Sequence, residues 1–314
     1  MKKILVTGGA GFIGSNLIES LLDRNYQVVC LDNLATGSIK NIEEFVGARN
    51  FEFIEGDILD YQLLSNLAKH AYAISHQAAL GSVPRSIKDP LTSNQVNITG
   101  TLNVFKAAVD NKVQRVVYAA SSSTYGDSHE LPKKEDNIGK PLSPYAVTKF
   151  VNELYADVFQ RVYGLNTIGL RYFNVFGPKQ DPNGSYAAVI PLFIKAIVSG
   201  KSPIINGDGN HSRDFTFVAN AVQANIKSLE APINCYNNVY NIACGHRTTL
   251  NEVIDFINDI EGTKIEARYQ DEREGDIKHS LADISKAKND IGYNPEFDVK
   301  QGLNLAMDWY KNNS

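Results

Sequence analysis

The stretch that decides the fold lies close to the start of the chain and reads Thr7-Gly8-Gly9-Ala10-Gly11-Phe12-Ile13-Gly14. It follows the apolar run at residues 4–7, which predicts a buried strand, and it opens the segment 13–24, whose apolar residues recur with helical spacing. The glycines permit a tight turn, a close approach of the backbone to a diphosphate, and close packing of the helix on the strand. Because the helix start also offers free N–H groups to an anion, the stretch predicts a dinucleotide-binding turn.

Short apolar runs and amphipathic segments alternate through the first half of the chain. Further buried strands are predicted at residues 28–32, 51–56, 73–77, 116–121 and 167–172. Helices are predicted at residues 61–69, 93–110 and 144–163. This repeated order of strand, helix and strand implies an α/β fold with a doubly wound parallel sheet of the Rossmann type, helices on both faces, and ligands at the carboxyl ends of the strands.

The pattern changes after about residue 177. Residues 178–184 form a polar, turn-rich link, helices are predicted after it at 187–199, 251–260 and 299–310, and residues 215–229 rejoin the first part. We therefore expect residues 1–177 to form a Rossmann domain that binds the dinucleotide, with returning segments near 215–245. Residues 178–314 are expected to form mainly a smaller, interleaved substrate-binding lobe.

The composition is that of an ordinary globular protein of 314 residues, with 43% hydrophobic and 21% charged residues and a formal net charge of -4. Basic residues are slightly outnumbered and form no run, so no nucleic acid partner is expected. No apolar run approaches the ~20 residues that a membrane span needs, so no membrane association is expected. Three cysteines are few and odd in number, and the chain leaves no room for a signal peptide before its first strand, which together favour reduced thiols and the cytoplasm.

An acidic residue, Asp32, stands at the end of the second predicted strand and strengthens the glycine motif. A carboxylate there accepts the ribose hydroxyls of the adenosine and repels a 2'-phosphate, so the sequence predicts NAD rather than NADP. Asp57 and the pair Ala78-Ala79 follow later strands, where an adenine and a nicotinamide ribose would pass. The alternatives are that Asp32 only caps a loop and that the other three are ordinary strand-end residues. No metal site is expected.

A candidate acid-base group follows the fifth predicted strand. Ser121 stands at the tip of that strand, and Tyr145 and Lys149 are four residues apart, which stacks them on one face of a helix. A free tyrosine has a pKa near ~10 and needs a fixed positive charge to act as a base at neutral pH. Taken alone, a Tyr-x-x-x-Lys pair is an ordinary surface feature. Together with the serine it provides a proton relay, a base and an electrostatic stabiliser.

The combination resembles the extended short-chain dehydrogenase/reductases, and within them the nucleotide-sugar 4-epimerases, closest to the bacterial UDP-N-acetylglucosamine 4-epimerases. The resemblance covers essentially the whole chain and is carried by the glycine-rich stretch and by residues 121–126, 143–149, 170–174, 207–214 and 273–276. It implies that Tyr145 is the general base, that Ser121 relays or steadies the proton, and that Lys149 lowers the phenol pKa and holds the nicotinamide ribose. It also implies that Arg213 and Arg273 clamp the diphosphate, a role that suits a planar guanidinium.

The motifs and the resemblance together give the expected site residues. The expected catalytic residues are Ser121, Ser123, Tyr145 and Lys149. The expected cofactor-binding residues are Gly8, Gly11, Phe12, Ile13, Gly14, Asp32, Asn33, Gly37, Ser38, Asp57, Ile58, Gln77, Ala78, Ala79, Tyr145, Lys149 and Tyr172. The expected substrate-binding residues are Ser82, Ser121, Ser122, Ser123, Tyr145, Asn174, Val189, Arg213, Arg273, Asp276 and Ser280.

The resemblance implies 4-epimerisation of a UDP-sugar, with tightly held NAD and no external reductant. Tyr145 takes the proton of the sugar 4-hydroxyl as hydride leaves carbon 4, and the 4-keto sugar turns over before hydride returns to its other face. In the family, a bulky residue at the position of Ser280 restricts the sugar to glucose and galactose, whereas a small one admits an acetamido group. Ser280 therefore implies UDP-N-acetylglucosamine and UDP-N-acetylgalactosamine as substrates, with room for UDP-glucose and UDP-galactose.

Two alternatives are open. Related 4,6-dehydratases carry an Asp-Glu pair where this chain has Ser122-Ser123, which argues against dehydration, but UDP-glucuronate 4-epimerases and decarboxylases also carry serines there. The other alternative is a non-catalytic NAD-binding regulator or scaffold, although such a protein does not need Ser121, Tyr145 and Lys149 together. Helices 93–110 and 144–163 are the usual dimerisation pair of the family, so a homodimer is expected.

Overall fold

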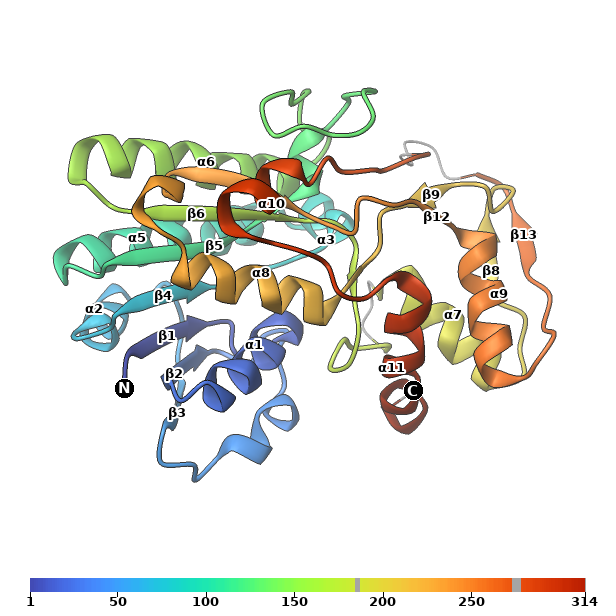
Figure 1. The fold of residues 1–314 in the computed structure, drawn as a ribbon, viewed down its shortest axis with the longest axis horizontal. Helices are drawn as coiled ribbons and strands as arrows, with labels where there is room; N and C mark the ends of the chain where they lie inside the picture. The colour runs from blue at the N-terminus through green and yellow to red at the C-terminus, as the bar shows by residue number, and fades with distance from the viewer. Residues whose placement is uncertain (184–186, 273–277, 314) are drawn as a thin grey trace.

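A seven-stranded parallel sheet forms the centre of the molecule in the computed structural model, which describes residues 1–183, 187–272 and 278–313 (Figure 1). Its strands are β1 (Lys3–Thr7), β2 (Gln27–Asp32), β3 (Phe51–Glu55), β4 (Ala73–His76), β5 (Arg115–Ser121), β6 (Thr167–Tyr172) and β11 (Asn238–Ile242). They lie in the order β11-β6-β5-β4-β1-β2-β3, and all neighbours are parallel. Because the order reverses between β1 and β4, the predicted doubly wound α/β fold is confirmed.

Helices cover both faces of the sheet, since successive strand residues point to opposite sides. α1 (Phe12–Asp23) and α8 (Val218–Glu230) pack on one face, and α2 (Tyr61–Ala68), α5 (Gly100–Asp110) and α6 (Pro144–Tyr163) pack on the other (Figure 1). Val6 belongs to the first of these two cores and its neighbour Leu5 to the second, and both are fully buried. Burial on both faces explains why the central strands are continuous apolar runs.

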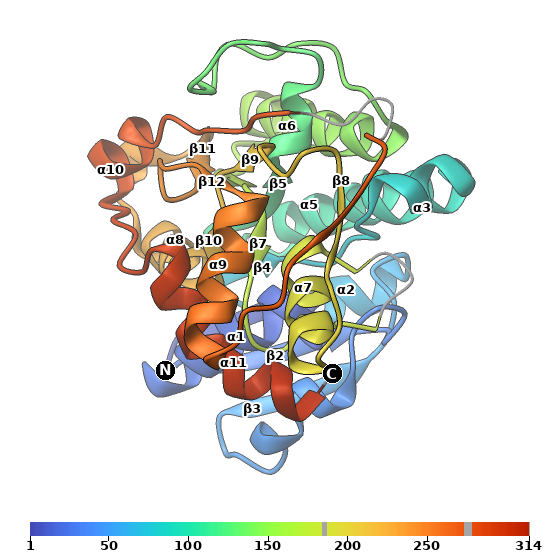
Figure 2. The same ribbon diagram turned by 90° about the vertical axis from the view of Figure 1, so that its right-hand side faces the viewer.

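A second group of elements lies beside the carboxyl ends of the strands (Figure 2). It contains α7 (Val189–Val198), α9 (Leu250–Glu261) and α11 (Val299–Asn313), which contact one another. It also contains three short strand pairs, β7 (Val175–Phe176) with β10 (Thr216–Phe217), β8 (Ile204–Asn206) with β13 (Arg268–Gln270), and β9 (Ser212–Arg213) with β12 (Thr248–Thr249). Although β11 and α8 come late in the chain, they belong to the central sheet and its cover. The division into a Rossmann domain and a substrate-binding lobe stays a prediction.

The structure differs most from the sequence prediction at residues 93–110. The apolar pattern predicts one helix there, whereas the structure has α4 (Pro90–Asn94), a π-helical turn (Gln95–Thr99) and α5. Asn94 and Gly100 keep α-helical backbone angles, so the three segments follow one another without a break. π turns inside helices frequently lie at functional sites. Two further short helices, α3 (Val83–Lys88) and α10 (Ser285–Ile291), were not indicated by the apolar pattern.

The three cysteines carry free thiols. Cys30 is fully buried behind the glycine-rich turn, and burial raises the pKa of its thiol to about 12. A thiol with so high a pKa is an inert apolar group rather than a nucleophile. In the described ranges, no helix is both long enough and apolar enough to cross a membrane.

A buried ion pair ties α6 to β6. The Arg171 guanidinium donates from Nε to Oε1 of Glu153 at 2.9 Å and from Nη2 to Oε2 at 2.7 Å, and both side chains are almost fully buried. Arg171 Nη1 also donates to the carbonyl of Glu135 at 2.9 Å, and the guanidinium lies over the ring of Tyr125. Arg171, the residue before Tyr172 in β6, is therefore a structural clamp on the helix that carries Tyr145.

Removal of that clamp should be costly. Arg171→Met leaves the Glu153 carboxylate buried without its partner, so we expect a loss of about 3 to 5 kcal/mol in the free energy of unfolding, measured in urea. The matched control is Arg161→Met, which breaks an exposed ion pair with Asp157 on the same helix and should cost less than about 1 kcal/mol. Equal losses in the two variants would contradict the proposed role of the buried pair.

Candidate active site

A cavity of about 740 Å³ opens at the carboxyl ends of the central strands, next to the point where the strand order reverses. The predicted residues that line it are Gly8, Gly11, Phe12, Ile13, Gly14, Asp32, Asn33, Asp57, Ile58, Gln77, Ala78, Ala79, Ser82, Ser121, Tyr145, Lys149, Tyr172 and Asn174. One continuous cavity therefore joins the predicted cofactor turn to the predicted acid-base group.

Sequence reasoning missed part of the cavity wall. Leu80 and Gly81 belong to the loop after β4, while Thr92, Gln95 and Val96 come from α4 and the π-helical turn. The other lining residues that were missed are Leu31, Ala35, Thr36, Gly56, Leu59, Ala119, Ala120, Val175 and Gln180. The apolar spacing of this segment is that of a regular helix, so it does not indicate the π turn or the residues that this turn contributes to the cavity wall.

The glycine-rich turn leaves no room for a side chain at Gly8 or at Gly14. Gly8 has a left-handed φ of 70°, and a Cβ there would lie 2.5 Å from the backbone nitrogen of Ala78. A Cβ at Gly14 would lie 2.1 Å from the carbonyl oxygen of Gly8. Gly37 and Ser38 do not line the cavity; the Ser38 N–H donates to the carbonyl of Ala10 at 3.0 Å and so holds the turn from outside.

Asp32 both caps the turn and faces the cavity. Its Oδ2 accepts from the Ala10 N–H at 2.9 Å and its Oδ1 from the Leu34 N–H at 2.8 Å. Burial raises the pKa of the carboxyl group, and these backbone hydrogen bonds oppose that rise. Each carboxylate oxygen can accept more than one hydrogen bond, so the loop-capping role does not exclude a contact with ribose hydroxyls.

Ser121, Tyr145 and Lys149 meet at the end of β5. Lys149 Nζ donates to the carbonyl of Ala119 at 2.8 Å and lies 5.9 Å from the centre of the Tyr145 ring. Ser123 donates to Ser121 Oγ twice, from its N–H at 3.1 Å and from its hydroxyl at 2.9 Å. Ser121 is in turn hydrogen-bonded to the Tyr145 side chain. The hydroxyls of Ser123, Ser121 and Tyr145 thus form a relay, although Ser123 does not itself line the cavity.

Burial and hydrogen bonding act in opposite directions on the pKa of the Tyr145 phenol. Burial raises the pKa of the Tyr145 phenol, and its hydrogen bond with Ser121 opposes that rise. Burial lowers the pKa of the Lys149 ammonium to about 8, so that at neutral pH Lys149 is mostly protonated. A buried cation next to a phenol is the arrangement that lets a tyrosine accept a proton when a reacting hydroxyl approaches.

Tyr172 is fixed beside the acid-base group by a network of side-chain amides. Its hydroxyl donates to Gln77 Oε1 at 3.1 Å and accepts from Asn225 Nδ2 at 2.7 Å. Gln77 Nε2 donates to Asn225 Oδ1 at 2.9 Å, which closes a triangle. Asn225 lies on α8 and is fully buried, yet sequence reasoning did not single it out. The available signal was a polar residue among the apolar residues of segment 215–229, which was expected to rejoin the first part of the chain.

A smaller pocket of about 210 Å³ shares Asn174 with the main cavity. It is lined by Asn174, Val189, Phe193, Ile204, Ile205, Asn206, His211, Arg213, Phe215 and Leu250. Three predicted substrate residues, Asn174, Val189 and Arg213, therefore lie together, and Arg213 Nη1 donates to the carbonyls of Ser212 and Lys278, both at 3.0 Å. The aromatic and apolar walls suit a flat ring, and the arginine beside them suits an anionic group. The pocket therefore suits a ligand that carries both.

The remaining predicted substrate residues are not brought to these walls. Ser122 lies in the 3-10 turn after β5, outside the residues that line either cavity. Ser280 lies outside both as well, and its N–H donates to the carbonyl of Ser212 at 3.0 Å, next to Arg213. Arg273 and Asp276 lie outside the described residues.

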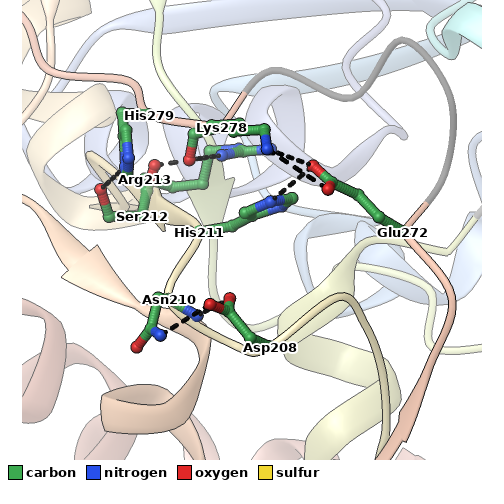
Figure 3. A network of polar contacts seen from close by, with 8 residues as sticks. All are labelled: Asp208, Asn210, His211, Ser212, Arg213, Glu272, Lys278 and His279. Carbon is green, nitrogen blue, oxygen red and sulfur yellow. Dashed lines mark hydrogen bonds and ion pairs between the residues drawn. The ribbon is translucent and has the colours of Figure 1, made fainter.

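A polar network adjoins the smaller pocket (Figure 3). Glu272 accepts from His211 Nε2 and from Lys278 Nζ, each at 3.1 Å, and Ser212 is hydrogen-bonded to His279 Nδ1 at 2.9 Å. His211 is the member of this network that also lines the pocket together with Arg213. The network therefore joins β9 to the chain on either side of residues 273–277.

A Rossmann fold with a serine, a tyrosine and a lysine at the cavity wall defines a dinucleotide-dependent enzyme, and comparison with known proteins agrees. Residues 4–243 match the NAD dependent epimerase/dehydratase family. A UDP-glucose 4-epimerase of Mycolicibacterium smegmatis is 34% identical over 314 residues, and the match covers 99% of each chain. The chain belongs to the NAD dependent epimerase/dehydratase family, which confirms the resemblance and makes a non-catalytic regulator or scaffold the wrong alternative.

Two solved structures are similar over their full length. A UDP-N-acetylglucosamine 4-epimerase from Methanobrevibacter ruminantium, in complex with UDP-N-acetylmuramic acid, is 42% identical with a TM-score of 0.95, and the match covers 100% of this chain and 99% of that one. A UDP-glucuronic acid 4-epimerase from Bacillus cereus, in complex with UDP-glucuronic acid and NAD, is 32% identical with a TM-score of 0.92, and the match covers 99% and 100%.

The cavity itself fits NAD, the cofactor of the family. Phe12, Ile13 and Gly14 form the first turn of α1 along its wall, where helix N–H groups bind a diphosphate. The carboxylate of Asp32, at the end of β2, would meet the adenosine ribose, which an acidic residue binds in this fold. NAD, when bound, accepts a hydride and gives it back, while the protein supplies orientation, charge and proton transfer.

The acid-base role of the tyrosine can be tested by removing one oxygen atom. Tyr145→Phe should keep the fold and NAD binding but lose on the order of 10² to 10⁴ in turnover, the usual effect of a positioned acid or base. Turnover and calorimetric binding of NAD are the measurements. The control is Tyr155→Phe, the same change further along α6, which does not touch the cavity and should keep near-native turnover. Near-native turnover in Tyr145→Phe would mean that another group takes the proton.

Proposed function

We propose that this protein is a UDP-sugar 4-epimerase that interconverts UDP-N-acetylglucosamine and UDP-N-acetylgalactosamine, with UDP-glucose and UDP-galactose as further substrates. The observation that carries the proposal is the relay from Ser123 through Ser121 to Tyr145, with Lys149 beside the phenol. Ser121, Tyr145 and Lys149 line the same cavity as the dinucleotide turn. The general class is supported by relatives whose names are UDP-sugar 4-epimerases.

The residues of the chain have distinct tasks in this reaction. Tyr145 accepts the proton of the sugar 4-hydroxyl and later returns it to the 4-keto oxygen, and Ser121 holds the phenol in place for both transfers. Lys149 keeps a positive charge beside the phenol and so favours its ionised form. Arg213 binds the diphosphate, while the apolar walls of the smaller pocket receive the uracil base. Such an anchor leaves the sugar free to present either face.

The preference for an N-acetylated sugar rests on one expectation from the resemblance and on one comparison. Ser280 is small at the position that limits the sugar in the family, and the relative from Methanobrevibacter ruminantium, at 42% identity, bears the name of a UDP-N-acetylglucosamine 4-epimerase. A second candidate, UDP-glucuronate 4-epimerisation, is favoured by the likeness to the Bacillus cereus enzyme, which binds UDP-glucuronic acid with the same fold.

We also infer a homodimer. Leu154, Val158 and Val162 recur every four residues along α6 and are exposed, and Tyr163 extends the stripe. α5 packs beside α6, so two copies can bury both stripes in one self-complementary four-helix contact. Sedimentation of the purified protein should give twice the mass of the chain. A monomer at micromolar concentration would remove this part of the proposal.

The proposed reaction is tested with a panel of substrates and no added cofactor. The panel contains UDP-N-acetylglucosamine, UDP-N-acetylgalactosamine, UDP-glucose, UDP-galactose and UDP-glucuronate, and the products are separated by chromatography. We expect turnover of both N-acetylated sugars. Turnover of the uronate alone would establish the second candidate instead, and no turnover of any member would refute both.

The cofactor preference follows from the charge of Asp32. NAD should bind at least about 10-fold more tightly than NADP, a difference of about 1.4 kcal/mol, because the carboxylate would face the 2'-phosphate. Asp32→Asn keeps the shape of the side chain and removes its charge, so it should reduce the ratio of NAD affinity to NADP affinity. Calorimetry on nucleotide-free protein measures both, and a wild-type protein that binds NADP as tightly as NAD would contradict the prediction.

Ser280 lies outside both cavities but next to Ser212 and Arg213, and the gating role that the resemblance implies for it gives a prediction about specificity. Ser280→Tyr should lose most activity on UDP-N-acetylglucosamine while activity on UDP-glucose survives, because the added ring would fill the space that an acetamido group needs. Exclusion by overlap can exceed the ~1 to 3 kcal/mol of a methylene-sized difference. Ser280→Ala adds no bulk and should keep both activities. Equal losses on both substrates in Ser280→Tyr would show that this residue is not the gate.

A further inference from the structure

The backbone of Tyr145 is held by side chains on both sides. Its N–H donates to the hydroxyl oxygen of Ser86 at 3.0 Å, and its carbonyl accepts from the hydroxyl of Thr148 at 2.8 Å. Ser86 comes from α3, a separate helix that contacts α6, and it is fully buried. The Ser86 hydroxyl itself donates a hydrogen bond to the carbonyl of Val83 at 2.8 Å. Both hydrogen-bonding directions of this buried hydroxyl are therefore used.

The contact from Ser86 completes the first turn of α6. Pro144 has no N–H, and the N–H groups of Ala146 and Val147 donate to Ser143, the first to its side chain at 3.1 Å and the second to its carbonyl at 3.0 Å. Ser143 belongs to the same stretch of chain, so these caps fix the helix only relative to itself. The Ser86 contact, in contrast, fixes the start of the catalytic helix relative to a different element.

α3 connects that helix start to the cavity wall. The residue before it, Ser82, caps its first turn, lines the cavity and holds a left-handed φ of 95°, a strained conformation for a residue with a side chain. Just before it, the N–H and carbonyl of Leu80 are bonded to the side-chain amide of Asn97, at 2.8 and 3.1 Å. Asn97 also donates to Thr148 Oγ1 at 3.1 Å. The stretch 80–86, whose first three residues line the cavity, is thus connected to α6 at two places, through Asn97 to Thr148 and through Ser86 to Tyr145.

We propose that Ser86 is a positioning residue for Tyr145, which holds the phenol at the distance from Ser121 that proton transfer needs. The inference rests on the proposed function, because it assumes that Tyr145 transfers the proton. A displacement of about 1 Å at a reacting group can cost ~10²-fold in rate. Without the Ser86 hydroxyl, the N–H of Tyr145 has lost its acceptor and the helix start can move away from α3. The phenol moves with it and loses its hydrogen bond to Ser121.

The test compares two serines that cap the same helix. Ser86→Ala should lower kcat at least ~10-fold with KM and NAD affinity little changed, and it should move the pH at which kcat rises to a higher value, since the phenol loses the hydrogen bond that opposes its raised pKa. Ser143→Ala removes the neighbouring cap, at Ala146, and should keep the pH profile of the wild type even if it lowers stability. Ser86→Thr keeps the hydroxyl and should restore the wild-type profile.

A second measurement does not depend on activity. Hydrogen exchange of the Tyr145 amide should be at least ~10-fold faster in Ser86→Ala than in the wild type, whereas in Ser143→Ala it is the Ala146 amide that loses protection. If the wild type turns over its UDP-sugar and Ser86→Ala has the same kcat and pH profile, the positioning role is refuted while the proposed function stands. If no UDP-sugar is turned over, the proposed function fails, and unchanged exchange at Tyr145 in Ser86→Ala then refutes the positioning contact as well.

Discussion

The whole site depends on one close approach between two backbones. Gly8 is the first residue of the turn after β1 and lies directly against Ala78, just past β4. β1 and β4 flank the point where the strand order reverses, so this contact forms the floor of the cavity. A side chain at position 8 would force the phosphate turn away from the loop that continues to Leu80 and Ser82. The dinucleotide turn and the acid-base group would then no longer face one cavity.

The core beneath the cavity stays uncharged next to a cation. His76 is buried between the hydroxyls of Thr7 and Thr101, at 2.7 and 2.9 Å from its two ring nitrogens. Burial lowers the pKa of its imidazole to about 3, and the charge of Lys149 acts in the same direction. The ring is therefore neutral at physiological pH, and Lys149, which lines the cavity, is the charged member of the two.

The spacing of apolar residues along the chain predicted the central strands and the helix that carries Tyr145. The six strands expected from apolar runs lie within one residue of their observed bounds, and α6 matches its predicted range, because buried strands and amphipathic helices are marked in their own sequence. The meeting of Ser121 with Tyr145 and Lys149 was also predictable, since it needs only a strand end and the helix that follows.

The features that escaped prediction depend on distant partners. The π turn contains Asn97, whose amide bonds the loop at Leu80, and the bonding partners of Asn225 lie on β4 and β6 and at Gln77. The sequence around each asparagine does not indicate these contacts, because the residues that bond to it lie far away in the chain. α3 is too short to show a helical spacing of apolar residues. Its start is set by the cap at Ser82 and by Pro84 in its first turn. The roles of Arg273, Asp276 and Ser280 come from the resemblance alone.

The late arrival of β11 has a consequence for synthesis of the chain on the ribosome. β6 pairs with β5 on one side. Its other edge stays unpaired until β11 is synthesised, which happens only after α7 and α8 have been made. At roughly 5 to 20 residues per second, the nascent chain carries β6 as an open sheet edge for several seconds. Such an edge can pair with another nascent chain. A chaperone that shields β6 during these seconds would act on the yield of active protein without touching its chemistry.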